Sequence, residues 1–321
     1  MRTITLEEHY ATRPFIEGPG QYLAGYTQLV EQLCDLGDHR IADMDAAGID
    51  VQVLSLTAPG VEQLDATEAV ALAREANDRL ADAVRRHPNR FAAFAALPTA
   101  APETAADELE RTVREHGFKG AMINGHTRGR YFDDEFFWPI LERAETLQVP
   151  VYLHPTPPPQ PVIEAAYKGT FAAEVAFGLA TAAWGWHVDT ATHVLRLVLG
   201  GVFDRYPSLQ LVIGHMGETL PFMLPRIELA FSHPMMSQVT KLDRPIGAYF
   251  RENLHYTFSG FNWIPTFLNL LLQVGVDRIM FSADYPYASM AEARAFLDQL
   301  PVSPADKVRI AHGNAERLLR L

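Results

Sequence analysis

The feature that constrains this chain most is the alternation, from end to end, of short apolar runs with longer segments of helical periodicity. Short apolar runs bounded by turn residues are typical of buried strands, and apolar residues three and four apart are typical of helices that cover a sheet. We expect eight strands, at residues 3–9, 51–56, 91–97, 120–125, 150–154, 209–215, 255–259 and 278–284. We expect helices between them, at residues 27–47, 65–87, 101–116, 136–147, 165–184, 189–205, 220–231, 264–274, 292–299 and 304–319.

Eight strands separated by helices predict a parallel sheet with both faces covered, and eight is the number that closes into a barrel. We therefore predict an α/β fold of the TIM-like (β/α)8 barrel type, with an open doubly wound sheet as the alternative. A single domain over residues 1–321 is expected, because barrels of this kind run to such lengths. The two helical stretches after the fifth strand, at about residues 160–206, form a helical insertion.

The charge pattern favours a small-molecule partner. The net charge is −12 and no run of Lys or Arg is present, whereas nucleic-acid and anionic membrane surfaces need clustered positive charge. The single cysteine, Cys34, has no partner for an internal disulfide, so we expect a reducing, cytoplasmic location. No export leader and no membrane-spanning window are expected either.

Polar residues stand where several of the predicted strands end. The carboxyl ends of barrel strands meet at one face, and active sites of such barrels lie there. We therefore expect these residues to converge on one site: Glu7-Glu8-His9, Asn124, His154, His215 and Asp284.

These residue types indicate a metal centre. Glu7 and His9 are two apart on a strand, so their side chains point to the same face. Taken singly, each residue has a structural explanation, such as a capping aspartate or a hydrogen-bonded core histidine. Together, a glutamate, two histidines and an aspartate suit a Zn²⁺ or Mn²⁺ ion and leave coordination positions open for a reaction.

Five motifs, in this order and spacing, resemble the amidohydrolase-related decarboxylases that act on hydroxybenzoates, such as the γ-resorcylate (2,6-dihydroxybenzoate) and 2,3-dihydroxybenzoate decarboxylases. The opening Glu-x-His is similar to that group, whereas hydrolytic amidohydrolases typically open with His-x-His. Ala288 departs from the pattern, because an acidic residue often follows the aromatic residue there. The motifs are Glu7-x-His9, Tyr152-Leu-His154-Pro155, Val212-Ile-Gly-His215-Met-Gly-Glu218, Leu224-Pro225-Arg226 and Phe281-Ser-Ala-Asp284-Tyr-Pro286.

The resemblance implies a carboxy-lyase that converts an ortho-hydroxybenzoate, such as 2,6- or 2,3-dihydroxybenzoate or salicylate, into CO₂ and a phenol without oxidation. One divalent ion per chain, Zn²⁺ or Mn²⁺, would be held by Glu7, His9, His154 and Asp284. Asp284 would also protonate the ring. His215 would handle the phenolic proton, because Glu218, three residues further on, is close enough to orient its imidazole.

Two further residues are candidates for substrate binding. Arg226 follows the sixth strand, and a guanidinium binds a carboxylate through two hydrogen bonds. The resemblance implies that Arg226 contacts the substrate or supports the site at a dimer edge; a surface ion pair with Glu228 is the alternative. Asn124 is the other candidate, and the resemblance also implies a homodimer or homotetramer.

Two other functions compete with decarboxylation. The same metal cage would activate water for hydrolysis of an amide, lactone or ester. A catalytically silent binding protein on a barrel scaffold is the third possibility. Three histidines, His126, His187 and His255, have no role that the sequence decides.

Overall fold

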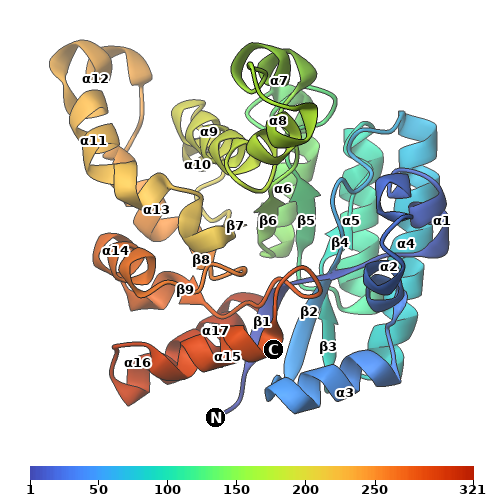
Figure 1. Ribbon diagram of the computed structural model, residues 1–321. Coiled ribbons are helices and arrows are strands. Elements are labelled where there is room, and N and C mark those ends of the chain that lie inside the picture. The colour runs from blue at the N-terminus through green and yellow to red at the C-terminus, as the bar shows by residue number, and fades with distance from the viewer.

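The computed structural model describes residues 1–321, and its parallel strands follow one another around a barrel in chain order (Figure 1). The third predicted strand is interrupted at Phe94, so it carries two labels. The chain is nevertheless continuous there, because the Phe94 N–H donates to Leu54 O and the Ala95 N–H to Gly120 O, both at 2.9 Å. The strands are β1 (Ile4–Tyr10), β2 (Val51–Leu56), β3 (Phe91–Ala93), β4 (Ala95–Ala96), β5 (Ala121–Asn124), β6 (Val151–His154), β7 (Leu211–Ile213), β8 (Leu254–Thr257) and β9 (Ile279–Met280).

The barrel closes between β1 and the segment that follows β9. The His9 N–H donates to Tyr285 O at 2.7 Å. The buried carboxylate of Glu8 accepts from the N–H groups of Ala283 and Tyr285, at 2.9 and 3.2 Å. The first and last strands are therefore held together where their carboxyl ends carry His9 and Asp284, and the predicted barrel is confirmed.

Seventeen α-helices connect and cover the strands. None of them is both long and apolar enough to cross a membrane. They are α1 (Arg13–Glu17), α2 (Thr27–Cys34), α3 (Asp38–Ala47), α4 (Ala66–Arg86), α5 (Pro102–His116), α6 (Trp138–Leu147), α7 (Gln160–Ala166), α8 (Ala173–Ala180), α9 (Gly185–Leu199), α10 (Val202–Arg205), α11 (Leu220–Ser232), α12 (Pro234–Thr240), α13 (Ile246–Glu252), α14 (Ile264–Val274), α15 (Met290–Gln299), α16 (Pro304–Val308) and α17 (Asn314–Leu319).

Some predicted helix boundaries were wrong. The expected helix at 27–47 is divided into α2 and α3, because the Asp35 carboxylate accepts from the N–H groups of Gly37 and Arg40 and turns the chain. The expected helix at 165–184 ends at Ala180, and α9 begins at Gly185. A Cβ at Gly185 would lie 2.3 Å from Ala180 O, so this close turn needs glycine. Helices α12 and α13 were not predicted.

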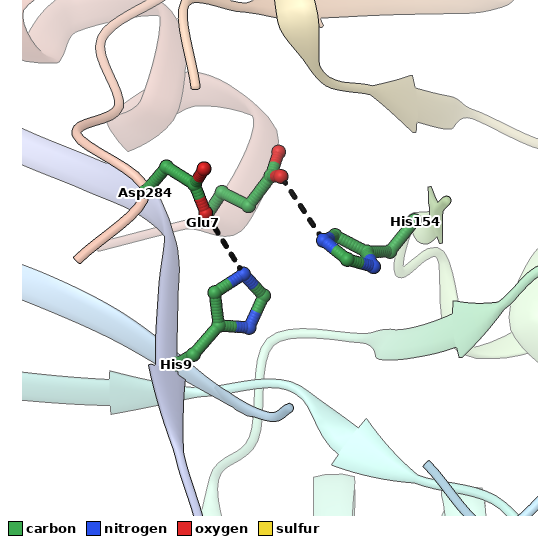
Figure 2. Close-up of side chains that lie close together, drawn as sticks. All are labelled: Glu7, His9, His154 and Asp284. Carbon is green, nitrogen blue, oxygen red and sulfur yellow. Dashed lines mark ion pairs between the residues drawn. The ribbon is translucent and has the colours of Figure 1, made fainter. Parts of the chain in front are cut away.

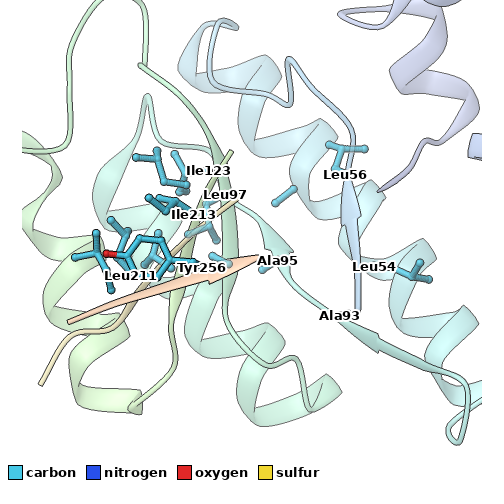
Figure 3. Close-up of a cluster of buried hydrophobic side chains, with 14 of the residues drawn as sticks. Leu54, Leu56, Ala93, Ala95, Leu97, Ile123, Leu211, Ile213 and Tyr256 are labelled. Carbon is cyan, nitrogen blue, oxygen red and sulfur yellow. The ribbon is translucent and has the colours of Figure 1, made fainter. Parts of the chain in front are cut away.

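The apolar core has two layers. Twelve buried residues, among them Ile4, Leu6, Val53 and Met280, form a cluster that fills the barrel. A second cluster of 69 buried residues lies mainly between the strands and the helices, and Figure 3 shows part of it, including Leu54 and other strand residues. The alternation of the strands explains the division, because successive side chains face the barrel interior and the helices in turn.

An irregularity in β1 aims the first motif into the barrel. The pairing of β1 with β2 shifts register between Thr5 and Glu8. As a result, two successive side chains face inward: Leu6 belongs to the cluster inside the barrel, and Glu7 hydrogen-bonds to Tyr152 of the same cluster. A bulge of this kind re-aims a side chain beside many active sites.

Candidate active site

Four of the predicted residues lie together at the carboxyl ends of the strands (Figure 2). Glu7 and His9 come from β1, His154 ends β6 and Asp284 follows β9. One ligand atom from each lies within 4.8 Å of the others. Glu7 Oε1 is 3.3 Å from His154 Nε2, and His9 Nε2 is 3.2 Å from Asp284 Oδ1.

The chemistry of this cluster fits a divalent metal ion. Two of the atoms that face the centre of the cluster, Glu7 Oε1 and His9 Nε2, are buried without a hydrogen bond. Buried polar atoms are normally paired, so unpaired atoms at one centre indicate a missing partner. Two carboxylates and two imidazoles are donors for an ion of the Zn²⁺ or Mn²⁺ type, and a carboxylate is a hard enough donor for Mn²⁺.

Glu7 is held in place by its second oxygen. Tyr152 OH and Ser259 Oγ both donate hydrogen bonds to Glu7 Oε2 and leave Oε1 directed at the histidines. Burial alone would raise the pKa of this carboxyl, but the nearby imidazoles of His215, His154 and His9 lower it well below its usual value. Glu7 is therefore a carboxylate with its charge directed into the cluster.

A second buried group adjoins the cluster and consists of His215, Glu218 and His187. His215 Nδ1 lies 2.7 Å from Glu218 Oε1, and His187 Nδ1 lies 2.5 Å from Glu218 Oε2. Burial raises the pKa of Glu218, but the two imidazoles lower it below its usual value. With Nδ1 facing Glu218, His215 directs Nε2 toward Glu7 Oε1, at 3.7 Å.

The backbone that carries His215 and Glu218 is unusual. Residues 215–219 all have positive φ, between 49° and 91°, although only Gly217 adopts that region without strain. Asp284, with φ 66°, shares the property. Strained residues of this kind gather at functional sites, where the surroundings must hold them. The strain thus coincides with the residues that sequence motifs single out.

The structure places the other candidates less directly. Asn124 is buried at the end of β5, where its N–H donates to Glu62 Oε1 at 2.6 Å and its Oδ1 has no partner. Arg226 is exposed on α11 and forms no ion pair or hydrogen bond, and Glu228 pairs with Arg251 instead, at 3.0 Å. The structure therefore does not bring Arg226 to the cluster within one chain.

The structure gives different locations to the three histidines whose roles the sequence left undecided. His126 accepts a hydrogen bond from the Gly129 N–H at Nδ1 and contacts Pro157 O through Nε2, so it fixes a loop. His255 is the second residue of β8 and therefore lies near the opposite end of the barrel. His187 alone joins the site. The sequence left its role undecided because residues 185–188 were expected between two helices, whereas they begin α9.

Glu62 is a buried acid at this end of the barrel that the sequence did not single out. Burial raises its pKa to about 8, so the carboxyl is largely neutral at pH 7. A carboxyl whose pKa is raised on folding binds more protons in the folded than in the unfolded state between pH 4.5 and 8. Its contribution to stability is therefore present below pH 4.5 and is lost as the pH rises through 8.

We expect Glu62→Gln to gain stability relative to the unmodified protein as the pH rises from 5.5 to 8.5, by at least about 1.4 kcal/mol, the equivalent of one pKa unit. Urea unfolding at both pH values measures the difference, in which all other titrating groups cancel. Glu115→Gln, at an exposed position on α5, should show no such change. A pH-independent difference for Glu62→Gln would show that Glu62 does not titrate in this range.

Comparisons with known proteins agree with this geometry. The family model described as "Amidohydrolase" matches residues 26–321. A γ-resorcylate decarboxylase from Polaromonas sp. is 38% identical, with 99% of this chain and 98% of that protein covered. The crystal structure of a 2,6-dihydroxybenzoate decarboxylase in complex with 2,6-dihydroxybenzoate is similar with a TM-score of 0.91, at 35% identity and full coverage of both chains.

A third relative was crystallised with a metal. The structure of 5-carboxyvanillate decarboxylase from Novosphingobium aromaticivorans, complexed with manganese and 4-hydroxy-3-methoxy-5-nitrobenzoic acid, is similar with a TM-score of 0.92. The two chains are 38% identical, and the match covers all of this chain and 96% of the other.

Proposed function

Because this chain belongs to the amidohydrolase family, we propose that it is a metal-dependent, non-oxidative decarboxylase of an ortho-hydroxybenzoate. Substrates of the 2,6- or 2,3-dihydroxybenzoate or salicylate type would yield CO₂ and a phenol. The observation that carries the proposal is the four-residue cluster of two carboxylates and two imidazoles, beside a buried His–Glu pair. The relatives, which are decarboxylases of such acids, support it over the entire chain.

We infer that Glu7, His9, His154 and Asp284 hold one Mn²⁺ or Zn²⁺ ion. When bound, the ion supplies a Lewis acid and a template for a carboxylate and a neighbouring phenolic oxygen. Tyr152 and Ser259 hold Glu7 by hydrogen bonds to the carboxylate oxygen that faces away from the ion. Glu8 holds Asp284 in place by accepting hydrogen bonds from the backbone N–H groups of the residues before and after it. Such supporting contacts orient ligands and tune their affinity.

The chain's own residues would then move two protons. Asp284, whose side chain is 17% exposed and can therefore exchange protons with water, would take up one proton and deliver it to the ring carbon that carries the carboxylate. His215 would hold the phenolic proton at Nε2, while Glu218 fixes its Nδ1. The bond from ring to carboxylate breaks as CO₂ leaves, and its electron pair restores the aromatic ring, so the net reaction consumes one proton.

Substrate contacts complete the proposal. Asn124 has a buried, unpartnered Oδ1 at the carboxyl end of β5, which suits a hydroxyl of the substrate. Arg226 has no hydrogen-bond or ion-pair partner and would bind a carboxylate. Because its own chain does not place it at the metal cluster, it would reach the site of a second copy of the chain. The two assignments rest on the unpartnered Oδ1 of Asn124 and the unpaired guanidinium of Arg226.

The exposed surface of α11 and α12 bears on the oligomeric state. We propose a homodimer or homotetramer, supported by exposed apolar side chains on α11 and α12, which extend away from the strands in Figure 1. Phe222, Leu229, Met235 and Val239 are each more than 60% exposed, and large apolar side chains exposed on two packed helices favour an association site. Sedimentation as a monomer at micromolar concentration would contradict this. A cytoplasmic location stays a prediction from Cys34.

Product identity tests decarboxylation against hydrolysis. Incubation with 2,6-dihydroxybenzoate in D₂O should yield CO₂ and a phenol with one deuterium at the former carboxyl position, because the ring carbon takes its proton from exchangeable groups. Mass spectrometry measures the label. Hydrolysis of an amide, lactone or ester, with uptake of oxygen from water and no CO₂, would support the alternative.

His187 should act on turnover through Glu218. We expect His187→Phe to lower kcat about 10-fold to 100-fold with little change in KM, because Glu218 loses the partner that holds its second oxygen. His187→Asn, which can still donate from the position of Nδ1, should recover most of that loss. The control is His193→Gln on the same helix, since His193 accepts a hydrogen bond from Phe132 N–H and does not contact the site. Equal losses in the Phe and Asn variants would show that His187 has only a packing role.

A further inference from the structure

A cavity of about 540 Å³ lies at the amino ends of the strands, opposite the metal cluster. Its wall contains the residues that precede β6, β7 and β9, the start of β8 and the end of the chain. Three arginines line it: Arg278, Arg317 and Arg320. Gln148, Gln210, His255 and Asp277 also line it.

None of the three arginines has a carboxylate partner. Arg278 Nη1 donates to Gln210 Oε1 at 3.1 Å and lies 3.1 Å from His255 Nε2, both neutral groups. Arg317 donates to a backbone carbonyl, Asp277 O, at 2.8 Å, and Arg320 donates to Gln148 Oε1 at 2.9 Å. Uncompensated arginines at a cavity are unusual in a chain with a net charge of −12.

One acid, Asp277, lines the cavity, and its carboxylate lies 3.7 Å from Arg309. Glu252, the other acid that acts on Arg278, lies 2.6 Å from Arg244. Lys119 adds positive charge at the rim, because its Nζ donates to Arg320 O at 3.2 Å. The basic groups at the cavity therefore outnumber its one lining carboxylate.

The basic groups also disfavour one another. Burial and the charge of Arg317 lower the pKa of Arg278. Burial and both of these arginines lower the pKa of His255 to about 3, so its ring is neutral. His255 is only 4% exposed, and its Nδ1 has no hydrogen-bond partner. An anion would relieve the repulsion between these groups.

The rim of the cavity is held by strained backbone. Gln148 and Arg320 both have positive φ, 54° and 53°, at helix ends where glycine is the usual residue. Their side chains hydrogen-bond to each other, so glycine at either position would remove this contact. Both side chains line the cavity and add polar groups to it.

We propose that this arginine cavity binds a small polyvalent oxyanion, of the phosphate or dicarboxylate class. Guanidinium groups bind such oxygens through paired, charge-assisted hydrogen bonds, and three of them line this cavity against a single lining carboxylate, that of Asp277. The site is separate from the metal cluster and does not depend on the reaction that we propose for it.

Isothermal titration of the full, metal-loaded chain with inorganic phosphate and with succinate tests the proposal. We expect saturable binding of one anion per chain and at least about tenfold weaker binding in the Arg317→Gln/Arg320→Gln double variant, because it removes two donors of charge-assisted hydrogen bonds. Arg278→Gln provides a second, independent variant. Arg85→Gln is the matched control for Arg278→Gln, since it also removes one positive charge, from an exposed position on α4.

The comparison of anions and variants gives distinct outcomes. Tighter binding of phosphate or of succinate to the unmodified protein than to the double variant supports the site. The anion with the higher affinity identifies the class that the site prefers. Equal affinity in the double variant, or equal weakening by Arg85→Gln, would mean an adventitious ion only and would overturn the proposal. Binding of benzoate alone would assign the signal to the metal cluster and would overturn it as well. Circular dichroism confirms that each variant is folded.

Discussion

His215→Asn is expected to lower kcat by about 10² to 10⁴ while leaving close to one metal ion per chain, because a positioned general acid or base contributes a factor of this size. His215 Nε2 faces Glu7, and Nδ1 is fixed by Glu218 at 2.7 Å. Asparagine keeps a polar side chain but has no atom that titrates as imidazole does. Steady-state kinetics and elemental analysis of the same preparation measure both quantities.

A double variant sharpens this test. Glu218→Gln should also lower kcat, since it removes the charge that orients and stabilises the imidazole. If the two residues act as a unit, His215→Asn/Glu218→Gln should be no slower than the worse single variant. Loss of the metal from His215→Asn would instead make His215 a ligand and would contradict the division of roles.

Removal of the metal is expected to abolish turnover. Dialysis against a chelator should remove one ion per chain, and Mn²⁺ or Zn²⁺ should restore activity, because four donors converge on one point. Glu7→Gln should bind the metal much more weakly, since it removes a buried carboxylate charge while Tyr152 and Ser259 remain. The melting temperature should fall in parallel, because an ion that binds only the folded state stabilises it. Full turnover after chelation would refute metal dependence.

Much of the fold could be predicted, because strand and helix periods are local properties of the sequence. The apolar run Val51–Leu56 is a strand over the whole expected range. The meeting of Glu7, His9, His154 and Asp284 followed from the barrel, in which strand ends far apart in the chain share one face. Their roles as ligands stay predictions.

Features that depend on tertiary contacts were out of reach. The β1 irregularity that turns both Leu6 and Glu7 inward exists only through pairing with β2. The left-handed backbone at His215 and Glu218 has no local signal apart from Gly217. His187 lies 31 residues before its partner Glu218, on a helix whose start depends on the close turn at Gly185. Glu62 is buried only because the barrel packs around it.

Substrate preference decides the proposed function, and it is measured by comparing 2,6-dihydroxybenzoate with 4-hydroxybenzoate on the Mn²⁺-loaded protein, with loss of the carboxylate followed by ultraviolet absorbance. We predict turnover of the first acid and none of the second, because only an ortho hydroxyl places a phenolic oxygen beside the carboxylate for joint binding at the four-residue cluster. Salicylate and 2,3-dihydroxybenzoate extend the series and rank the effect of a second hydroxyl, which we expect the small side chain of Ala288 to alter. Equal turnover of 4-hydroxybenzoate, or no decarboxylation of any ortho-hydroxybenzoate, would refute the proposed function.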